Sequence, residues 1–181
     1  MRNHVRGLSL AELLVTVAVM TVALTVALPV FGGLQERTRL AAALHQLTGS
    51  LAVARSHAVT GGRPVTVCPS GDGTTCRGDL AWEDGWILFA DPQRRGLPAS
   101  SADVLQHVGP LPGTIRVRST PGRTRVRYLA GGRAHGSNLT LRLCSTDGRL
   151  LGSVVVNNSG RARVQRSRGS VACPWNVEKR A

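Results

Sequence analysis

The sequence predicts an α+β fold in which one long N-terminal helix packs on an antiparallel β-sheet. Two observations lead to this class. Apolar residues recur first at helical and later at strand spacing, and the period changes between Gly61 and Pro64. Glycine, proline and asparagine then separate the later apolar runs, as they separate short strands. A helix with one apolar stripe buries it most simply against one face of a sheet.

The first 31 residues of the 181-residue chain combine a basic start with an apolar run of membrane length. Arg2 and Arg6 come first, and residues 8–28 would form a helix of about 30 Å, the thickness of the hydrocarbon core. Glu12 lies inside this segment, where an unpaired charge costs about 2.5 kcal/mol or more. The arginines on the N-terminal side predict that the rest of the chain lies outside the cytoplasm.

The spacing of Gly7, Leu8, Glu12 and Pro29 resembles the class III signal of type IV pilins and pseudopilins. In that family a prepilin peptidase cuts after the glycine and methylates the new amine. The glutamate then neutralises the N-terminal amine of a neighbouring subunit in the filament. The resemblance implies processing between Gly7 and Leu8 and an assembly role for Glu12. Most family members have phenylalanine where this chain has Leu8.

The same resemblance implies a division of the chain into three parts. Residues 1–7 would be the leader, residues 8–30 the transmembrane and filament-core helix, and residues 31–181 a periplasmic pilin-like domain. The protein would sit in the bacterial inner membrane by a single pass and then enter a pilus or pseudopilus. A secretory signal peptide or a plain signal anchor is the alternative. The first has a shorter, acid-free apolar core, and the second does not explain Gly7 or Glu12.

Beyond a flexible point expected at Gly32-Gly33, the pattern predicts an amphipathic helix to about residue 60, followed by short strands. One apolar stripe recurs at three- and four-residue steps: Leu40, Leu44, Leu47, Leu51, Ala54 and Ala58. The glycines at 61 and 62 end this helix. The expected strands are centred on Val65 and Val67, Trp86 to Phe89, Ile115 and Val117, Val126 and Tyr128, Leu139 to Leu143, and Val154 and Val156. Residues 91–107 fit no motif and are interpreted as an inserted loop.

The four cysteines form an even set without the spacing of a zinc site. In an oxidising periplasm they would pair, and three connectivities are possible. We favour Cys68–Cys76, which closes a short loop, and Cys144–Cys173, which attaches the tail to a strand. The second closes a loop of about 30 residues, for which chain entropy gives roughly 3 to 4 kcal/mol.

Motifs of the globular part resemble the FimT/GspH group of minor pilins and pseudopilins. They are Cys68-Pro69-Ser70 with Asp72-Gly73 and Cys76, Trp82 to Phe89, Leu143-Cys144, and Asn158-Ser159-Gly160-Arg161-Ala162-Arg163. The last run is similar to the G-R-x-R motif of FimT-type minor pilins. This resemblance implies the type IV pilin-like fold and binding of double-stranded DNA during uptake by type IV pili.

The charge distribution points to the same partner independently. Residues 1–110 hold nine arginines and eight acids, a net charge of +1, whereas residues 111–181 hold fourteen basic residues and two acids, a net charge of +12. Such asymmetry is typical of a surface that binds a polyanion. With 22 arginines and one lysine, the composition is biased, so the position of each arginine matters more than its type.

The candidate DNA-binding residues are Arg161, Arg163, Arg166, Arg168 and Arg142. Arg161 and Arg163, if extended, would point the same way about 6.6 Å apart and could grip separate phosphates. The alternative is a polar turn that packs the tail. A second alternating set flanks a turn at Pro121-Gly122, as either a solvated hairpin face or a binding surface: Arg116, Arg118, Arg123, Arg125 and Arg127.

Aromatic residues are scarce, which disfavours base readout. Trp82, Trp86, Phe89 and Tyr128 lie in apolar runs and are expected in the core. Trp175 could either stack on a base or cap the sheet, with packing favoured. Without a helix-turn-helix pattern, we expect salt-sensitive binding through phosphates.

No nucleophile motif or phosphate loop is present, so we expect no enzyme, no catalytic residues and no cofactor. Asp72, Asp79 and Asp84 lack the spacing of a calcium loop, and we expect no metal. Two functions remain open. The first is a DNA-binding minor pilin that serves natural transformation. The second is a structural minor pseudopilin of a type II secretion system, or a pilus-priming subunit.

Overall fold

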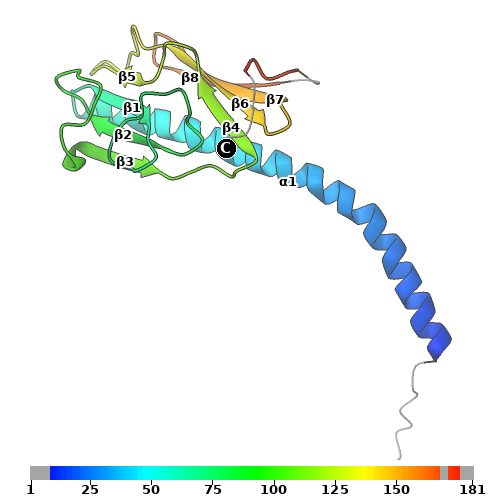
Figure 1. Ribbon diagram of the computed structural model, residues 1–181. Helices are drawn as coiled ribbons and strands as arrows, with labels where there is room; N and C mark the ends of the chain where they lie inside the picture. The colour runs from blue at the N-terminus through cyan, green and yellow to red at the C-terminus, as the bar shows by residue number, and fades with distance from the viewer. Residues whose placement is uncertain (1–8, 168–170, 176–181) are drawn as a thin grey trace, which may run out of the picture. The chain divides into compact units, whose positions relative to one another are not determined.

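A computed structural model of the protein describes residues 9–167 and 171–175 (Figure 1). One long helix, α1 (Leu10–Thr60), precedes eight β-strands and a short 3₁₀ helix, η1 (Ser101–Asp103). The chain divides into two compact units, Met1–Thr38 and Arg39–Ala181. The second unit contains all the strands and therefore all the β-structure considered below.

Helix α1 begins directly after Ser9, which caps it. The Glu12 amide donates to the Ser9 hydroxyl at 3.2 Å, and the Leu13 amide donates to the Ser9 carbonyl at 3.2 Å. The helix ends as predicted at the glycine pair, where Gly62 has a φ of 59°. The flexible point expected at Gly32-Gly33 is wrong, because α1 continues through it. A glycine costs a helix only about 1 kcal/mol, which a continuous ladder of hydrogen bonds offsets.

The first unit exposes many large apolar side chains. Between Leu10 and Leu24 these are Leu10, Leu13, Leu14, Val15, Val17, Val19, Met20, Val22 and Leu24. Within the part of the chain that the structure describes, no helix meets the combined length and hydropathy of a membrane span. The transmembrane segment at residues 8–30 stays a prediction.

The first sheet is four-stranded and antiparallel. Its strand order is β3-β2-β1-β5. The bounds are β1 Val65–Pro69, β2 Trp86–Ala90, β3 Val104–Val108 and β5 Val126–Tyr128. All residues of β1 and β2 are buried, as the continuous apolar run of β2 indicates.

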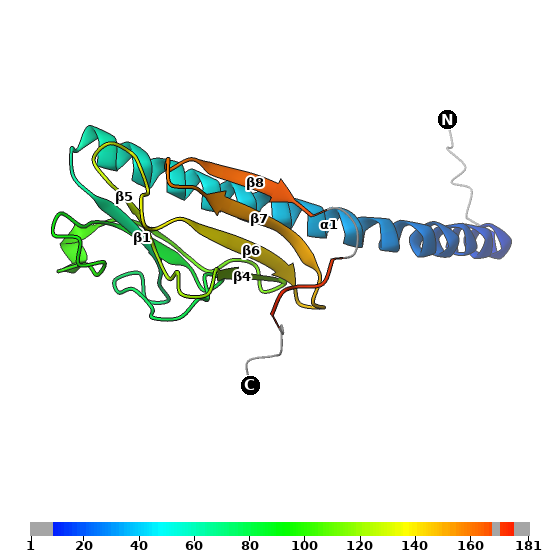
Figure 2. The same cartoon turned by 90° about the horizontal axis from the view of Figure 1, so that it is seen from above.

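The second sheet is also four-stranded and antiparallel. Its order is β4-β6-β7-β8, and Figure 2 shows these strands side by side with β8 nearest to α1. The bounds are β4 Ile115–Ser119, β6 Leu139–Ser145, β7 Leu150–Val156 and β8 Ala162–Arg166. Strand β8 is an edge strand that the periodicity of the sequence did not predict.

One core joins the helical stripe to both sheets. Leu44, Leu47 and Leu51 are buried on α1 and belong to the same apolar cluster as Trp86 and Tyr128 of the first sheet and Leu141 of the second. Trp82 and Phe89 are buried as well. The predictions of the apolar stripe and of a core role for these aromatic residues are confirmed.

Two sequence interpretations are wrong. Residues 91–107 are not simply a loop, because they contain η1 and most of β3, which pairs with β2. The residues around Pro121-Gly122 do not join a hairpin, since β4 and β5 belong to different sheets. The strand at residues 104–108 was missed because its side chains show no apolar alternation, and the pairing of β4 depends on distant residues.

Each sheet carries one disulfide. Cys68 and Cys76 are bonded beside the first sheet, and Cys144 of β6 is bonded to Cys173 of the tail. They are the same two pairs that the sequence analysis favours. The backbone bridge between Arg149 and Ala172 also holds the tail against the end of the second sheet.

Candidate nucleic-acid interface

The second sheet has an apolar inner face and an arginine-rich outer face. Along β4 and β6, buried residues alternate with half-exposed ones, and the half-exposed positions include Arg116, Arg118 and Arg142. The buried neighbours of these arginines pack in the core with α1. Successive side chains of a strand point to opposite sides, so these three guanidinium groups lie on the side away from α1.

Arg118 and Arg142 are directly opposite each other in the β4–β6 pairing. Side chains in such positions have Cβ atoms about 5 Å apart, and like charges there destabilise a sheet. The Nε atom of Arg118 is also buried without a hydrogen-bond partner among the described residues. This arginine pair therefore weakens the isolated sheet, whereas a bound anion would stabilise it.

Arg161 and Arg163 extend this face to the edge of the sheet. Ala162 packs against the core, while Arg161 and Arg163 on either side of it are exposed. Arg163 lies opposite Val155 of β7, whose side chain is half-exposed. Alternation thus places the two arginines on the outer face, about 6.6 Å apart along the chain.

A tight turn fixes the direction of this arginine pair. Asn157 organises the turn, since its side-chain oxygen accepts from the Arg161 amide at 3.1 Å and its carbonyl accepts from the Gly160 amide at 2.9 Å. Gly160 has a φ of 78°, and a Cβ atom there would lie 2.1 Å from the Gly132 carbonyl oxygen. Only glycine fits this close approach. The glycine of the G-R-x-R run thus has a structural role: it allows the turn that positions the two arginines.

The guanidinium groups on the outer face have no partner among residues 9–167 and 171–175. In the described part of the chain, no hydrogen bond or ion pair engages the guanidinium groups of Arg116, Arg118, Arg142, Arg161 and Arg163. Asp147 is the acid nearest in sequence to β6 and β7. Hydrogen bonds from the Ser145 hydroxyl and the Arg149 guanidinium lower the pKa of Asp147 to about 2. This face is therefore cationic and open to a polyanion.

The other predicted site residues lie elsewhere. Arg166 is on the opposite side of β8 from Arg163 and lines a hollow beside α1. Arg168, Gly7 and Leu8 lie outside the described residues. Glu12 is exposed in the first turn of α1, where a carboxylate is favourable beside the helix N-terminus.

The arginines of β5 and of the segment before it have structural roles. The Arg127 Nε atom is 3.0 Å from the buried Asp91 carboxylate, and its Nη2 atom donates to the Arg94 carbonyl at 2.8 Å. Arg125 donates to the Gly96 carbonyl at 2.6 Å. Arg123 donates to the Gly136 carbonyl at 2.7 Å. These three do not share a face with Arg116 and Arg118, although the sequence analysis grouped all five.

The aspartates once considered for calcium have other partners. Asp72 accepts hydrogen bonds from Thr75, Thr74 and Ser70, which hold its pKa well below the usual range. Asp79 and Asp84 pair with Arg77 and raise the pKa of its guanidinium. The described residues contain no cluster of three histidine, cysteine or acidic side chains.

The aromatic side chains do not form a stacking surface on the arginine face. Trp82, Trp86 and Tyr128 are fully buried, and burial raises the pKa of Tyr128 well above its usual range. Trp175 is half-buried and its Nε1 atom is enclosed. The outer face therefore offers charge rather than base-stacking.

A protein-family model described as type II transport protein GspH matches residues 43–160. The chain belongs to the GspH family. The match of this GspH-family protein ends directly before Arg161, so the arginine pair lies beyond it. Comparison with curated proteins finds no match.

Solved structures are similar to this GspH-family protein over most of its length. The type IV minor pilin FimU of Pseudomonas aeruginosa PAO1 is 23% identical, with a TM-score of 0.54 over 77% of this chain and 96% of FimU. A second crystal form of FimU gives 21% identity and a TM-score of 0.53 over 73% and 98%. The minor pseudopilin EpsH of the Vibrio cholerae type 2 secretion system is 13% identical, with a TM-score of 0.48 over 68% and 94%. The likeness to FimU confirms the predicted type IV pilin-like fold.

Proposed function

We propose that this GspH-family protein is a minor type IV pilin that binds double-stranded DNA without sequence specificity during natural transformation. The observation that carries the proposal is the outer face of the second sheet. Five arginines lie there without a partner among the described residues, and two of them face each other across β4 and β6. Family membership implies assembly with other pilins in filaments.

The geometry supports contact with phosphates rather than bases. From β4 to β8 the face spans three inter-strand distances, about 14 Å, with guanidinium groups at both edges. Arginine forks suit phosphate oxygens, and each neutralised phosphate releases counterions. If all five arginines contact phosphates, the log-log salt slope of the affinity is about −4.5.

Delivery to a filament belongs to the same proposal. The prepilin peptidase would cut between Gly7 and Leu8, and the inner membrane would hold residues 8–30 until assembly. Glu12 would then neutralise the terminal amine of a neighbouring subunit. Its exposed place in the first turn of α1 supports this role.

The second candidate is a structural minor pseudopilin of a type II secretion system, or a subunit that primes a pilus. The match to the family described as type II transport protein favours it. The exposed apolar side chains between Leu10 and Leu24 serve filament packing equally well in both candidates. The arginine face favours the first candidate.

A gel-shift assay on the full-length processed protein in non-ionic detergent tests the proposal. We expect duplex DNA to be retarded at low salt, and the Arg161→Gln/Arg163→Gln variant to need about tenfold more protein for the same shift. The matched control is Arg63→Gln/Arg95→Gln, which removes two exposed charges outside the second sheet.

If the control variant retards DNA as strongly as the parent, the weaker binding of Arg161→Gln/Arg163→Gln is due to the site and not to the lower net charge. Equal retardation by the Arg161→Gln/Arg163→Gln variant would remove these residues from the site. A parent protein that leaves DNA unshifted would favour the structural candidate.

A further inference from the structure

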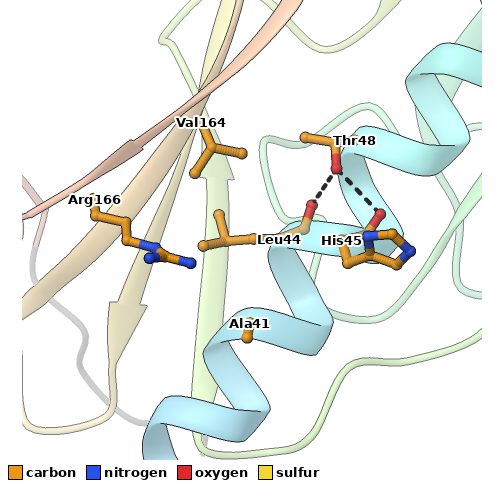
Figure 3. A pocket seen from close by; sticks show the side chains of 6 residues that line it. All are labelled: Ala41, Leu44, His45, Thr48, Val164 and Arg166. Carbon is orange, nitrogen blue, oxygen red and sulfur yellow. Dashed lines mark hydrogen bonds between the residues drawn. The ribbon is translucent and has the colours of Figure 1, made fainter.

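A groove separates α1 from β8, and Arg161, directly before the strand, borders one end of it. One part, of about 450 Å³, lies between Ala41, Leu44, His45 and Thr48 of the helix and Val164 and Arg166 of the strand (Figure 3). A second part, of about 410 Å³, shares His45 and Thr48 and continues to Arg55 and Tyr128. The two parts form one groove along about 21 Å of α1, the length of about six residues of extended chain.

The strand that borders the groove has an open backbone edge. Strand β8 is last in its sheet and pairs only with β7. The Arg161 carbonyl accepts from Asn157 at 3.4 Å and the Ser167 amide donates to Leu151 at 3.2 Å, so odd-numbered residues bond to β7. The backbone groups of Ala162, Val164 and Arg166 therefore point away from β7, toward the open edge that borders the groove. Among the described residues, none of them has a backbone partner there.

The lining has an apolar floor and a cationic rim. Leu44 and Leu51 are buried at the floor, and Val164 is 44% exposed above it. The charged or basic side chains along the groove are those of His45, Arg55, Arg161 and Arg166, and none of the described residues that line it is an acid. The Arg55 Nε atom is bonded to the Gly132 carbonyl, which fixes this side chain at the groove while its Nη atoms stay available.

A buried polar atom also borders the groove. The Tyr128 side chain is fully buried and lines the second part, yet its hydroxyl has no hydrogen-bond partner among the described residues. An enclosed hydroxyl without a partner costs free energy, and a carboxylate is a suitable acceptor for it.

We propose that this groove binds an extended acidic segment of a partner protein, which joins the second sheet as a fifth strand beside β8. The open backbone edge supplies hydrogen bonds to a peptide, and the apolar floor takes every second side chain. The intervening acidic side chains meet the cationic rim. A nucleic-acid strand fits less well, because it cannot continue the alternating ladder of a β-sheet.

The test measures binding of a fluorescent eight-residue peptide of alternating valine and glutamate to the full-length protein in detergent micelles. We expect saturable binding with a Kd below about 1 mM, and none for the matched valine–lysine peptide. Two variants address the groove. Gly49→Leu places a large side chain in the second part of the groove, which Gly49 lines. It should do so without a clash, because a Cβ at Gly49 meets no atom within 4 Å. Val164→Pro removes an amide from the open edge and leaves the β7 ladder intact.

Both variants should raise the Kd for the acidic peptide by at least about tenfold. Gly49→Ala, the control, should stay within about twofold of the parent. Undiminished binding by Gly49→Leu would overturn the proposal, as would lack of binding up to about 1 mM. If single-stranded DNA competes with the peptide, and Gly49→Leu abolishes binding of that DNA, the groove would be assigned to nucleic acid instead. Arg142→Gln, which lies outside the groove lining, should weaken duplex retardation and leave peptide binding unchanged, so this proposal and the proposed function fail separately.

Discussion

Arg127 of the first sheet and Arg142 of the second occupy equivalent places in their strands. Both are half-exposed residues between buried neighbours. Arg127 is bonded to the buried Asp91, whereas Arg142 faces Arg118 and has no partner among the described residues. The comparison teaches that, in an arginine-rich chain, the partner of each arginine shows its role better than the residue type does.

The acids explain this difference. Residues 1–110, which build β1, β2 and β3, hold eight of the ten acids, so an arginine of the neighbouring β5 such as Arg127 finds an acid there. The second sheet is built from a part with two acids, Asp147 and Glu178. Its outer face therefore carries uncompensated charge, which a polyanion can neutralise.

The largest effect should come from Gly160→Val, which disrupts the turn that directly precedes Arg161 and Arg163. The new Cβ would clash with the Gly132 carbonyl, and valine strongly disfavours a φ of 78°. We expect a loss of about 3 kcal/mol in the free energy of unfolding, measured by urea denaturation, together with weaker DNA binding.

Gly136→Ala is the control for backbone strain alone. Gly136 has a φ of 74°, but its Cβ would meet nothing within 4 Å. We expect Gly136→Ala to lower the free energy of unfolding by about 1 kcal/mol. Equal losses for the two variants would mean that the approach to Gly132 contributes nothing.

The next prediction compares the stability effect of replacing one arginine in each sheet. Arg127→Met should lower the free energy of unfolding by about 2 to 3 kcal/mol, because it leaves the buried Asp91 carboxylate without its ion pair. Arg142→Met should change it by no more than about 0.5 kcal/mol, since it relieves repulsion from Arg118. Thermal and urea unfolding of the two variants measure this. The opposite ranking would contradict the division into structural and available arginines.

A smaller effect concerns the salt dependence of DNA binding. Removing one phosphate contact should make the log-log slope shallower by about 0.9, so Arg142→Met should show this change. Arg127→Met should keep the slope of the parent, because its guanidinium is already neutralised by Asp91. Titrations in the gel-shift assay at several salt concentrations provide both slopes. Identical slopes for parent and Arg142→Met would exclude Arg142 from the interface.

The smallest effect is a pH dependence at Asp147. Hydrogen bonds lower its pKa in the folded state to about 2, below the value of about 3.9 for an unfolded aspartate. The stabilisation is therefore complete above about pH 4 and is lost as the pH falls through about 2. Asp147→Asn should remove this part of the acid-induced decrease in Tm. A variant whose Tm follows that of the parent from pH 5 to pH 2 would show that these hydrogen bonds do not matter.

Local patterns were enough to predict much of this molecule. The alternation around Leu141, Arg142 and Leu143 predicts a strand with an outward arginine, and the structure has it. The apolar stripe from Leu44 to Ala58 predicts the buried side of α1 in the same way. Such features depend only on the period of neighbouring residues.

Pairing between distant segments could not be predicted. The alternation in Arg116 and Arg118 is the same whether β4 pairs with β5 or with β6, so the opposition of Arg118 to Arg142 depends on register. Strand β3 carries mostly exposed side chains and shows no apolar alternation. The groove beside β8 is formed by residues of α1 and β8 that lie more than a hundred positions apart.

The bond between Cys144 and Cys173 closes a covalent ring that contains β7, β8 and the arginine pair. Peeling of an edge strand starts at a free end, and inside this ring β8 has none. If Arg161 and Arg163 bind a polymer as proposed, a pull on it would be carried at both ends of the segment to β6, the central neighbour of β4 and β7. The strand that would bear this load is therefore attached by a covalent bond as well as by hydrogen bonds.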